Sequence, residues 1–328
     1  MPVTPEVSII VPARNEEVCL GDCLASLVTQ TGVAFEILVV DDQSTDRTRA
    51  IAQGFAGVRV ISSGVLPAGW TGKNNAVVAG AKEARGELLL FTDGDTVHLP
   101  GSLARAVAEA KEHRADLLSY SPEQIVITFA EKAVMPVVFA ELAAQYPLER
   151  VRDQSSGVVA ANGQYILVRR AAYDKVGGHA AVADKILEDV ALARAFRAAG
   201  YDVYFRYGAD AVRTRMYRNW SDLRDGWTKN LALLFPQPGW RAVRIVAWWA
   251  FAWIALPLLI PVMALYWWLL RANFEWGTTV VAAAFGPPIF SYLLLRSCGA
   301  HARGSVLWKG RTYSDREAAT SAQELRRP

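Results

Sequence analysis

Two stretches decide the fold of this chain, Val7–Pro12 (VSIIVP) and Phe35–Asp42 (FEILVVDD). Each is a run of β-branched and aliphatic residues, and a segment long enough for one helix separates them. The alternation continues in the apolar runs Val58–Ile61, Glu87–Phe91 and Leu117–Ser121. Apolar strands that alternate with helices are typical of a parallel sheet with helices on both faces. The sequence therefore predicts an α/β fold with a mostly parallel sheet.

The intervening segments carry helix signals. Asn15 is expected to cap a helix that ends near Gln30, since asparagine favours the N-cap position. Among the further helices expected are one from Lys73 to Ala84 and one over residues 187–199, where Gly200 ends it.

Acidic residues follow two of the predicted strands. Asp41-Asp42 ends the second, and Asp93-Gly94-Asp95 follows the fourth. One such cluster could simply cap the next helix, but two clusters at the edge where α/β sheets bind ligands favour a site. Gly94 is expected to allow a sharp turn, and carboxylate oxygens suit Mg²⁺ or Mn²⁺ on a diphosphate.

A lysine is expected to begin the third helix. Lys73 could contact phosphate beside the helix amides, or it could be an ordinary solvated lysine. No G-x-G-x-x-G follows the first strand, and Gly72-Lys73 is followed by asparagine where a P-loop has serine or threonine. A dinucleotide site and a P-loop are therefore excluded.

The overall composition excludes one class of partner and indicates a compartment. The 328 residues carry a net charge of +3, which is too small for a nucleic-acid-binding surface. Three cysteines without zinc-type spacing indicate free thiols in a reducing cytoplasm, and no signal peptide is expected.

The C-terminal third is strongly apolar. Residues 245–270 and 276–295 carry no charge, so we expect a transmembrane hairpin, with a buried helical pair in a soluble core as the alternative. Arginine, lysine and histidine flank both outer ends, which predicts that both termini lie in the cytoplasm. The expected organisation is a catalytic domain over 1–235, two transmembrane helices within 240–296 and a basic tail over 297–328, in a multi-pass protein of the cell membrane.

Five motifs in order resemble one family. VSIIVPARNEE, VVDDQSTDRT, GWTGKNNA, FTDGDT and ILEDVALARAFRAAG are similar to the inverting family 2 glycosyltransferases of the GT-A fold, over roughly residues 6–205. The resemblance implies a nucleotide-sugar donor, expected to be a UDP-sugar, and a Mg²⁺ or Mn²⁺ cofactor. It makes Asp93 and Asp95 the metal-binding pair, with Asp95 nearest the metal. The residues implied to bind the nucleotide sugar are Pro12, Arg14, Glu16, Asp41, Asp42, Lys73, Asp93 and Gly94.

The resemblance also implies a catalytic base, Asp189, with Glu188 beside it. Inverting transfer to a hydroxyl needs a group that takes the proton, and a placed carboxylate can do so. The two residues are helix neighbours about 100° apart, so they cannot face the site equally. By the residues alone, Asp189 could equally be a surface carboxylate.

The acceptor is expected to be a membrane lipid. Residues 224–230 (RDGWTKN) and 308–311 (WKGR) resemble a subgroup that acts on carotenoid or hopanoid lipids. The QxxRW motif of processive members is replaced by RMYRNW at 215–220, which favours transfer of a single sugar. A polyprenyl-phosphate glycosyltransferase and a non-catalytic nucleotide-binding membrane scaffold remain as alternatives. The residues expected on the acceptor side are Arg215, Arg218, Trp220 and Trp227.

Overall fold

The computed structural model describes residues 4–271 and 273–314, which form two compact units. The first, the sheet unit, consists of Met1–Glu123 and Leu148–Thr214. The second, the helical unit, consists of Gln124–Pro147 and Arg215–Pro328. Residues 124–147 thus group with the C-terminal helices, whereas their sequence suggested a place in a first domain ending near residue 235. The predicted division into a cytoplasmic domain, membrane spans and tail stays a prediction.

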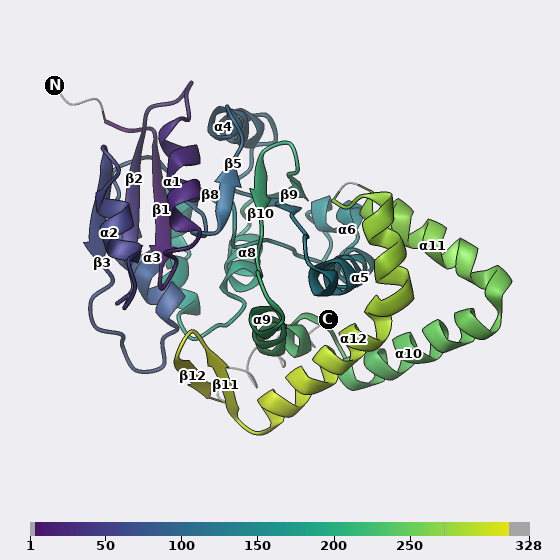
Figure 1. The fold of residues 1–328 in the computed structure, drawn as a ribbon. Coiled ribbons are helices and arrows are strands. Elements are labelled where there is room, and N and C mark those ends of the chain that lie inside the picture. The colour runs from purple at the N-terminus through teal and green to yellow at the C-terminus, as the bar shows by residue number, and fades with distance from the viewer. Residues whose placement is uncertain (1–3, 272, 315–328) are drawn as a thin grey trace. The chain divides into compact units, whose positions relative to one another are not determined.

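A seven-stranded sheet organises the sheet unit, with the strand order β3-β2-β1-β4-β8-β6-β9 (Figure 1). All neighbouring pairs are parallel except those of β8, which runs antiparallel to both β4 and β6. The predicted mostly parallel α/β sheet is therefore confirmed. The strands of this sheet are β1 (Val7–Ala13), β2 (Phe35–Asp41), β3 (Val58–Ser62), β4 (Leu88–Phe91), β6 (Leu117–Ser121), β8 (Ile166–Arg169) and β9 (Val203–Tyr207).

Helices cover both faces of this sheet because its strands are apolar on both sides. In β1, Val7, Ile9 and Val11 pack into one buried cluster with α1, whereas Ile10 packs into another with α3. Such two-sided burial explains the continuous apolar runs in the sequence. The helices of this unit are α1 (Leu20–Val28), α2 (Thr48–Gln53), α3 (Gly72–Glu83), α4 (Ser102–Glu112), α6 (Leu148–Arg152), α7 (Arg170–Lys175), η1 (Gly178–Val182) and α8 (Glu188–Ala198).

The predicted N-cap of the first helix is wrong. Asn15 has φ 52, and α1 begins only at Leu20. Its side chain instead accepts a hydrogen bond from the Thr45 backbone N–H at 2.9 Å. Asparagine tolerates this left-handed conformation, so the residue joins two loops and does not start a helix.

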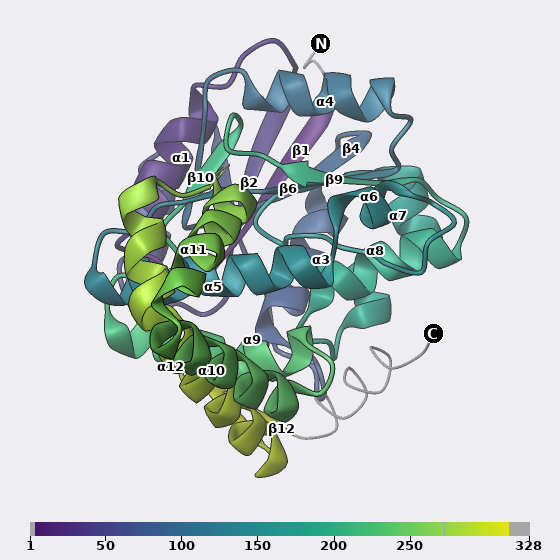
Figure 2. The same ribbon diagram turned by 90° about the vertical axis from the view of Figure 1, so that its right-hand side faces the viewer.

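Among its described residues, the helical unit contains α5 (Phe129–Gln145) and four later helices, which Figure 2 also shows. Thr128 and Glu131 form a capping box at the start of α5. Its buried side chains share a cluster with residues of the later helices, including Trp227 and Phe290. The remaining elements of this unit are α9 (Trp220–Leu234), α10 (Pro238–Ile254), α11 (Leu256–Leu270), α12 (Trp276–Ala302) and a hairpin of β11 (Ser305–Trp308) and β12 (Arg311–Ser314).

The first predicted transmembrane helix, over 245–270, is not continuous. Ala255 leaves the helical conformation with φ −100 and ψ 66, and Pro257, which lacks a backbone N–H, follows in the first turn of α11. Figure 1 shows α10 and α11 running in different directions from this point. Among the described residues, only Trp276–Ala302 is both long and apolar enough to cross a membrane.

Candidate active site

Both acidic clusters lie at the carboxyl edge of the parallel strands. Asp41 is the last residue of β2 and pairs in register with Ala13 at the end of β1. Asp93 and Asp95 follow β4, which is the neighbour of β1 on its other side. The three strands run in the same direction, so their ends bring the clusters to one edge of the sheet, where α/β proteins bind ligands.

The two aspartates after β2 have different surroundings. Asp41 accepts a hydrogen bond from the Ser44 backbone N–H at 3.1 Å, and its other oxygen pairs with Arg49 at 3.3 Å. Asp41 therefore holds the turn into α2. Asp42 is buried and accepts from the Ser63 hydroxyl at 2.9 Å.

The loop after β1 is tied to the end of β2. Arg14 donates to the backbone carbonyl of Asp42 at 2.7 Å, and the Glu16 backbone N–H donates to the Thr48 hydroxyl at 2.7 Å. Pro12 pairs with Val40 within the sheet. These contacts place the ends of β1 and β2 side by side.

A buried network of hydroxyl groups stabilises the turn after β4. Thr96 donates to the Asp93 carbonyl at 2.7 Å, and Thr92 donates to the Gln164 carbonyl at 2.8 Å. His98 lies within hydrogen-bond distance of both threonine hydroxyls. Burial lowers the pKa of His98 to about 3, so its ring stays neutral.

The expected turn does occur at Gly94, but glycine is not needed to form it. The φ of Gly94 is not positive, and an added Cβ would come no closer than 3.5 Å to Glu16.

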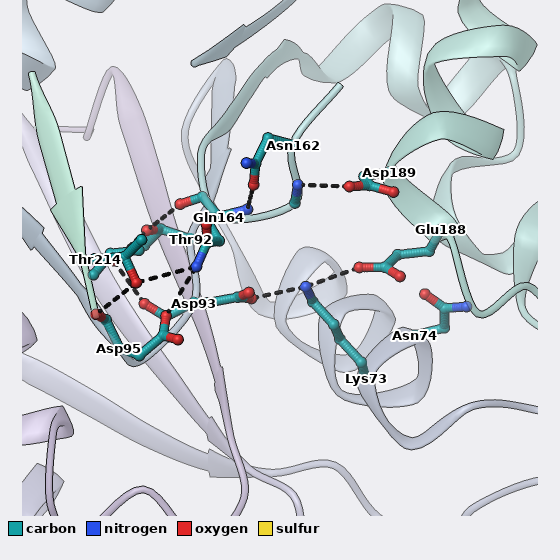
Figure 3. Close-up of polar contacts among 12 residues, drawn as sticks. Lys73, Asn74, Thr92, Asp93, Asp95, Asn162, Gln164, Glu188, Asp189 and Thr214 are labelled. Atoms are coloured by element: carbon teal, nitrogen blue, oxygen red, sulfur yellow. Dashed lines mark hydrogen bonds and ion pairs between the residues drawn. The ribbon is translucent and has the colours of Figure 1, made fainter. Parts of the chain in front are cut away.

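Lys73 joins motifs that are far apart in the chain. Its Nζ lies 2.8 Å from Asp93 Oδ1 and 2.8 Å from Glu188 Oε1 (Figure 3). It occupies the first turn of α3, which Thr71 caps by accepting the Asn74 backbone N–H. Burial alone would lower the pKa of Lys73, but the two carboxylates outweigh it and raise that pKa well above the usual value. This lysine is therefore a fixed positive charge between two carboxylates.

Asp189 faces a different partner from its neighbour Glu188. Its Oδ2 accepts the Gly163 backbone N–H at 2.9 Å, and its Oδ1 accepts the Val190 N–H at 2.8 Å. Burial, followed by the charge of Glu188, raises the pKa of Asp189 to about 6. A carboxylate with such a pKa is mostly ionised near pH 7 and still basic enough to take a proton.

Two residues at this site were not predicted from the sequence. Asn74 is fully buried, and its amide nitrogen lies 2.9 to 3.2 Å from the carbonyls of Val182, Ala183 and Lys185, which lead into α8. Gln164 donates to the Thr214 hydroxyl at 3.1 Å and lies 3.5 Å from Asp95 Oδ1. An asparagine beside a lysine and a glutamine before an apolar strand carry no local signal for these long-range contacts.

The four residues expected on the acceptor side lie in the helical unit. Arg215 pairs with the buried Glu131 through two contacts, at 2.9 and 3.1 Å. Trp227 is only 3% exposed, and its indole donates to Met135 Sδ at 3.4 Å, which leaves no face for an acceptor. Its expected acceptor role is therefore not supported by its position. Arg218 and Trp220 are exposed.

The side chains of the site supply only some of the ligands that a metal ion needs. Within residues 4–271 and 273–314, no group of three or more His, Cys, Asp or Glu side chains could hold a metal ion. Asp93 and Asp95 supply carboxylate oxygens. Gln164 approaches Asp95 through its amide nitrogen, and its buried Oε1 has no hydrogen-bond partner. Two carboxylates suit Mg²⁺ when the remaining ligands come from phosphates and water.

Comparison with known proteins identifies the family. Residues 8–177 match the family model described as glycosyl transferase family 2, and the chain belongs to this family. It is 30% identical over 243 residues to the 4,4'-diaponeurosporenoate glycosyltransferase of Staphylococcus haemolyticus, covering 70% of this chain and 62% of that protein. The protein of the same name from Staphylococcus aureus is 29% identical over 234 residues, covering 69% of this chain and 60% of that protein. The match thus spans less than two thirds of these relatives.

A solved structure shows the same fold. The mannosyltransferase PcManGT of Pyrobaculum calidifontis superposes with a TM-score of 0.51 at 17% identity, covering 91% of this chain and 87% of that chain. The GT-A fold predicted from the motifs is confirmed by this likeness.

Proposed function

We propose that this protein is an inverting glycosyltransferase that moves one sugar from a nucleotide sugar, expected to be a UDP-sugar, to a hydrophobic lipid acceptor. Family membership and the name of the Staphylococcus relatives support sugar transfer. The single observation that carries the proposal is the Lys73 bridge from Asp93 to Glu188, with Asp189 adjacent in the chain. A fixed cation among carboxylates at the strand ends suits a diphosphate beside a catalytic base.

The donor is proposed to lie along the strand ends. Asp42, with Arg14, Pro12 and Glu16 around it, would contact the base and ribose. Asp41 is the second candidate, and it also holds the turn into α2 through Ser44 and Arg49. Lys73 and the turn containing Gly94 would contact the diphosphate.

A divalent cation would be held by Asp95 and Asp93 together with phosphate oxygens. Bound there, Mg²⁺ or Mn²⁺ would offset negative charge on the departing nucleotide. The structure of PcManGT was solved with GDP-Man and Mn²⁺, which supports a metal in this fold.

The proposed reaction is one displacement at the anomeric carbon. An acceptor oxygen forms a bond to that carbon while the bond to the diphosphate oxygen breaks, and the configuration inverts. If the acceptor is a hydroxyl, Asp189 takes its proton. Lys73 contributes positive charge near the site that loses the diphosphate.

The class of acceptor decides whether a base is needed. The name of the relatives specifies diaponeurosporenoate, a carboxylate, and an ionised carboxylate has no proton to lose. The same holds for the alternative of a polyprenyl-phosphate acceptor. The second alternative, a non-catalytic scaffold, gives no reason for Lys73 and the carboxylates of Asp93, Glu188 and Asp189 to gather at one edge.

The experiment is a screen of the purified full chain. Nucleotide sugars would be tested with a hydrophobic alcohol, carboxylate and polyprenyl phosphate in detergent with Mn²⁺, and products would be read by mass. We expect a glycosylated lipid from the wild type and none from Asp95→Ala. Absence of both transfer and donor hydrolysis with every donor would contradict the proposal.

The location proposed is the cytoplasmic face of the cell membrane, with both termini in the cytoplasm. One helix apolar enough to span, Trp276–Ala302, supports membrane association. The basic flanks of the apolar region support the orientation.

A further inference from the structure

An apolar surface remains uncovered on the helical unit. It consists of Trp240, Trp248, Phe251 and Ile254 on α10 together with Ile260 and Trp268 on α11, and we call it the aromatic surface. These side chains are between 49% and 84% exposed. The opposite side of α10 is buried against α12 through Ala242 and Ile245. The spacing on α10 is that of one helix face, so α10 presents a mostly apolar, exposed face.

We infer that the aromatic surface inserts into one leaflet of an anionic bilayer and that the helical unit lies in the membrane plane without crossing it. The inference rests on the proposed membrane location and replaces the two-span arrangement expected from the sequence. It does not depend on the reaction catalysed.

The composition of this region fits lipid as the occupant. Tryptophan is the residue typical of the membrane interface, and an in-plane helix combines aromatic residues with basic ones. Exposed Arg244 lies within the α10 face, and Arg271 at the end of α11 stacks over Trp268 at 5.5 Å. Residues 124–147 and 215–314 of the helical unit contain twelve Arg and Lys against five Asp and Glu, an excess that favours anionic headgroups. A symmetric contact with a second copy would bring these like charges together.

The helices of this surface are too short to span. The 17 residues of α10 and the 15 of α11 extend about 25 and 22 Å, whereas the hydrocarbon core is about 30 Å thick. The non-helical break at Ala255 prevents them from acting as one span.

The longer helix α12 is held against charged groups. A Cβ on Gly286, near the middle of its apolar stretch, would lie 2.3 Å from the Ala133 carbonyl, so α5 touches α12 directly there. Two residues from Ala133, Glu131 pairs with Arg215. If residues 276–295 crossed the hydrocarbon, this ion pair would lie near the bilayer centre, where charges are strongly disfavoured.

The C-terminal half of α12 is attached to a polar helix. Ser297 donates to the Thr228 carbonyl at 2.7 Å and accepts the Ala232 backbone N–H at 2.9 Å, both on α9. Next to Thr228, α9 carries Asp225 and Lys229. These contacts attach one side of α12 to α9 and α5.

Labelling of a cysteine between α11 and α12 tests the in-plane arrangement. Glu275→Cys would be made with Cys19→Ser and Cys298→Ser, while Cys23 is fully buried and remains. Val65→Cys, at a side chain 87% exposed in the sheet unit, is the matched control. We expect an impermeant maleimide to label both cysteines in inside-out vesicles and neither in intact cells. Labelling of the Glu275→Cys protein in intact cells would overturn the inference.

Flotation with vesicles of phosphatidylcholine and phosphatidylglycerol tests lipid binding. We expect the double variant Trp248→Asp/Phe251→Asp to lose about tenfold in bound fraction, because charge replaces inserted aromatic rings. The control, Val18→Asp/Val65→Asp, changes exposed apolar residues of the sheet unit and should float like the wild type. Equal flotation of all three, or a stable dimer that excludes vesicles, would overturn the inference. Donor hydrolysis in detergent, which needs no bilayer, shows separately whether the proposed reaction fails.

Discussion

Replacing Asp189 by asparagine should lower activity and, at neutral pH, raise stability. Burial and the neighbouring Glu188 raise the pKa of Asp189 from 3.8 to about 6. The native state therefore binds a proton more tightly than the unfolded chain, and stability falls as the pH rises from 3.8 towards 6. Above that range the ionised carboxylate lowers the free energy of unfolding by at most about 3 kcal/mol, because about two pKa units are involved and the side chain keeps some contact with water.

The Asp189→Asn variant should escape this pH-dependent cost, because an asparagine side chain carries no charge at any pH. Its amide keeps only one acceptor oxygen for the two backbone N–H groups of Gly163 and Val190, which costs about 1–2 kcal/mol at every pH. The free energy of unfolding of the variant, relative to that of the wild type, should therefore rise by up to about 3 kcal/mol between about pH 4 and pH 8.

The assay is urea unfolding of both proteins at the two pH values, with steady-state transfer measured alongside. Asp184→Asn is the matched control, since its side chain is 45% exposed and its loss should change stability by less than about 0.5 kcal/mol. With a hydroxyl acceptor, Asp189→Asn should lower kcat by about 10²–10⁴-fold, and the wild-type rate should fall about tenfold per pH unit below pH 6. With a carboxylate or phosphate acceptor, both effects should be small.

Two results would refute this reasoning. A stability difference that is the same at both pH values would show that the pKa of Asp189 is not raised in the folded protein. A normal kcat with every acceptor would show that Asp189 is not the base, and Glu188 would be tested next.

Other contacts of the site and of α5 lead to four more expected outcomes. Lys73→Met should weaken donor binding about tenfold or more, with partial recovery in Lys73→Arg, as measured by calorimetry; unchanged affinity would exclude a phosphate contact. Excess chelator should abolish turnover and Mn²⁺ should restore it, whereas full activity in chelator would end the metal proposal. Asn74→Ala should lower the free energy of unfolding by about 2–3 kcal/mol in chemical denaturation, because three buried carbonyls lose their donor; a loss below about 0.5 kcal/mol would count against this. Glu131→Gln should lower the free energy of unfolding by about 2–4 kcal/mol near pH 7 and by little near pH 3. Burial alone would raise the pKa of Glu131, but the hydrogen bonds from Arg215 outweigh it and lower that pKa. The stabilisation is therefore present above about pH 4.5 and is lost as the pH falls below that value.

Much of the sheet unit could be predicted because its signals are local. The runs that became β1, β2, β4 and β6 are apolar on both faces, and strands of that kind are buried in parallel sheets whatever their neighbours are. Asn15 shows the limit of such reasoning. Its residue type suits a helix cap and a left-handed turn equally, and the contact with Thr45, thirty residues later, selects the turn.

The apolar C-terminal region shows the same limit on a larger scale. Hydropathy over 245–270 is uniform, so it cannot locate the break at Ala255. The burial of Trp227 and the pairing of Arg215 with Glu131 depend on α5. This helix lies far from Trp227 and Arg215 in the sequence. The residue type of a tryptophan or an arginine does not show whether its side chain contacts an acceptor or packs against a neighbouring helix.

The sequence by itself determined the fold class, the family and the acidic residues at the strand ends, because strand periodicity and strand termini are properties of short segments. Only the tertiary structure decided which side chains meet. Lys73 contacts both Asp93 and Glu188, and Asp189 contacts Gly163, because packing of α3 and α8 at one edge of the sheet brings these segments together. The physical reason is that hydrogen bonds and ion pairs act over about 3–4 Å, whereas the distance between such segments is set by the packed core and not by the chain between them.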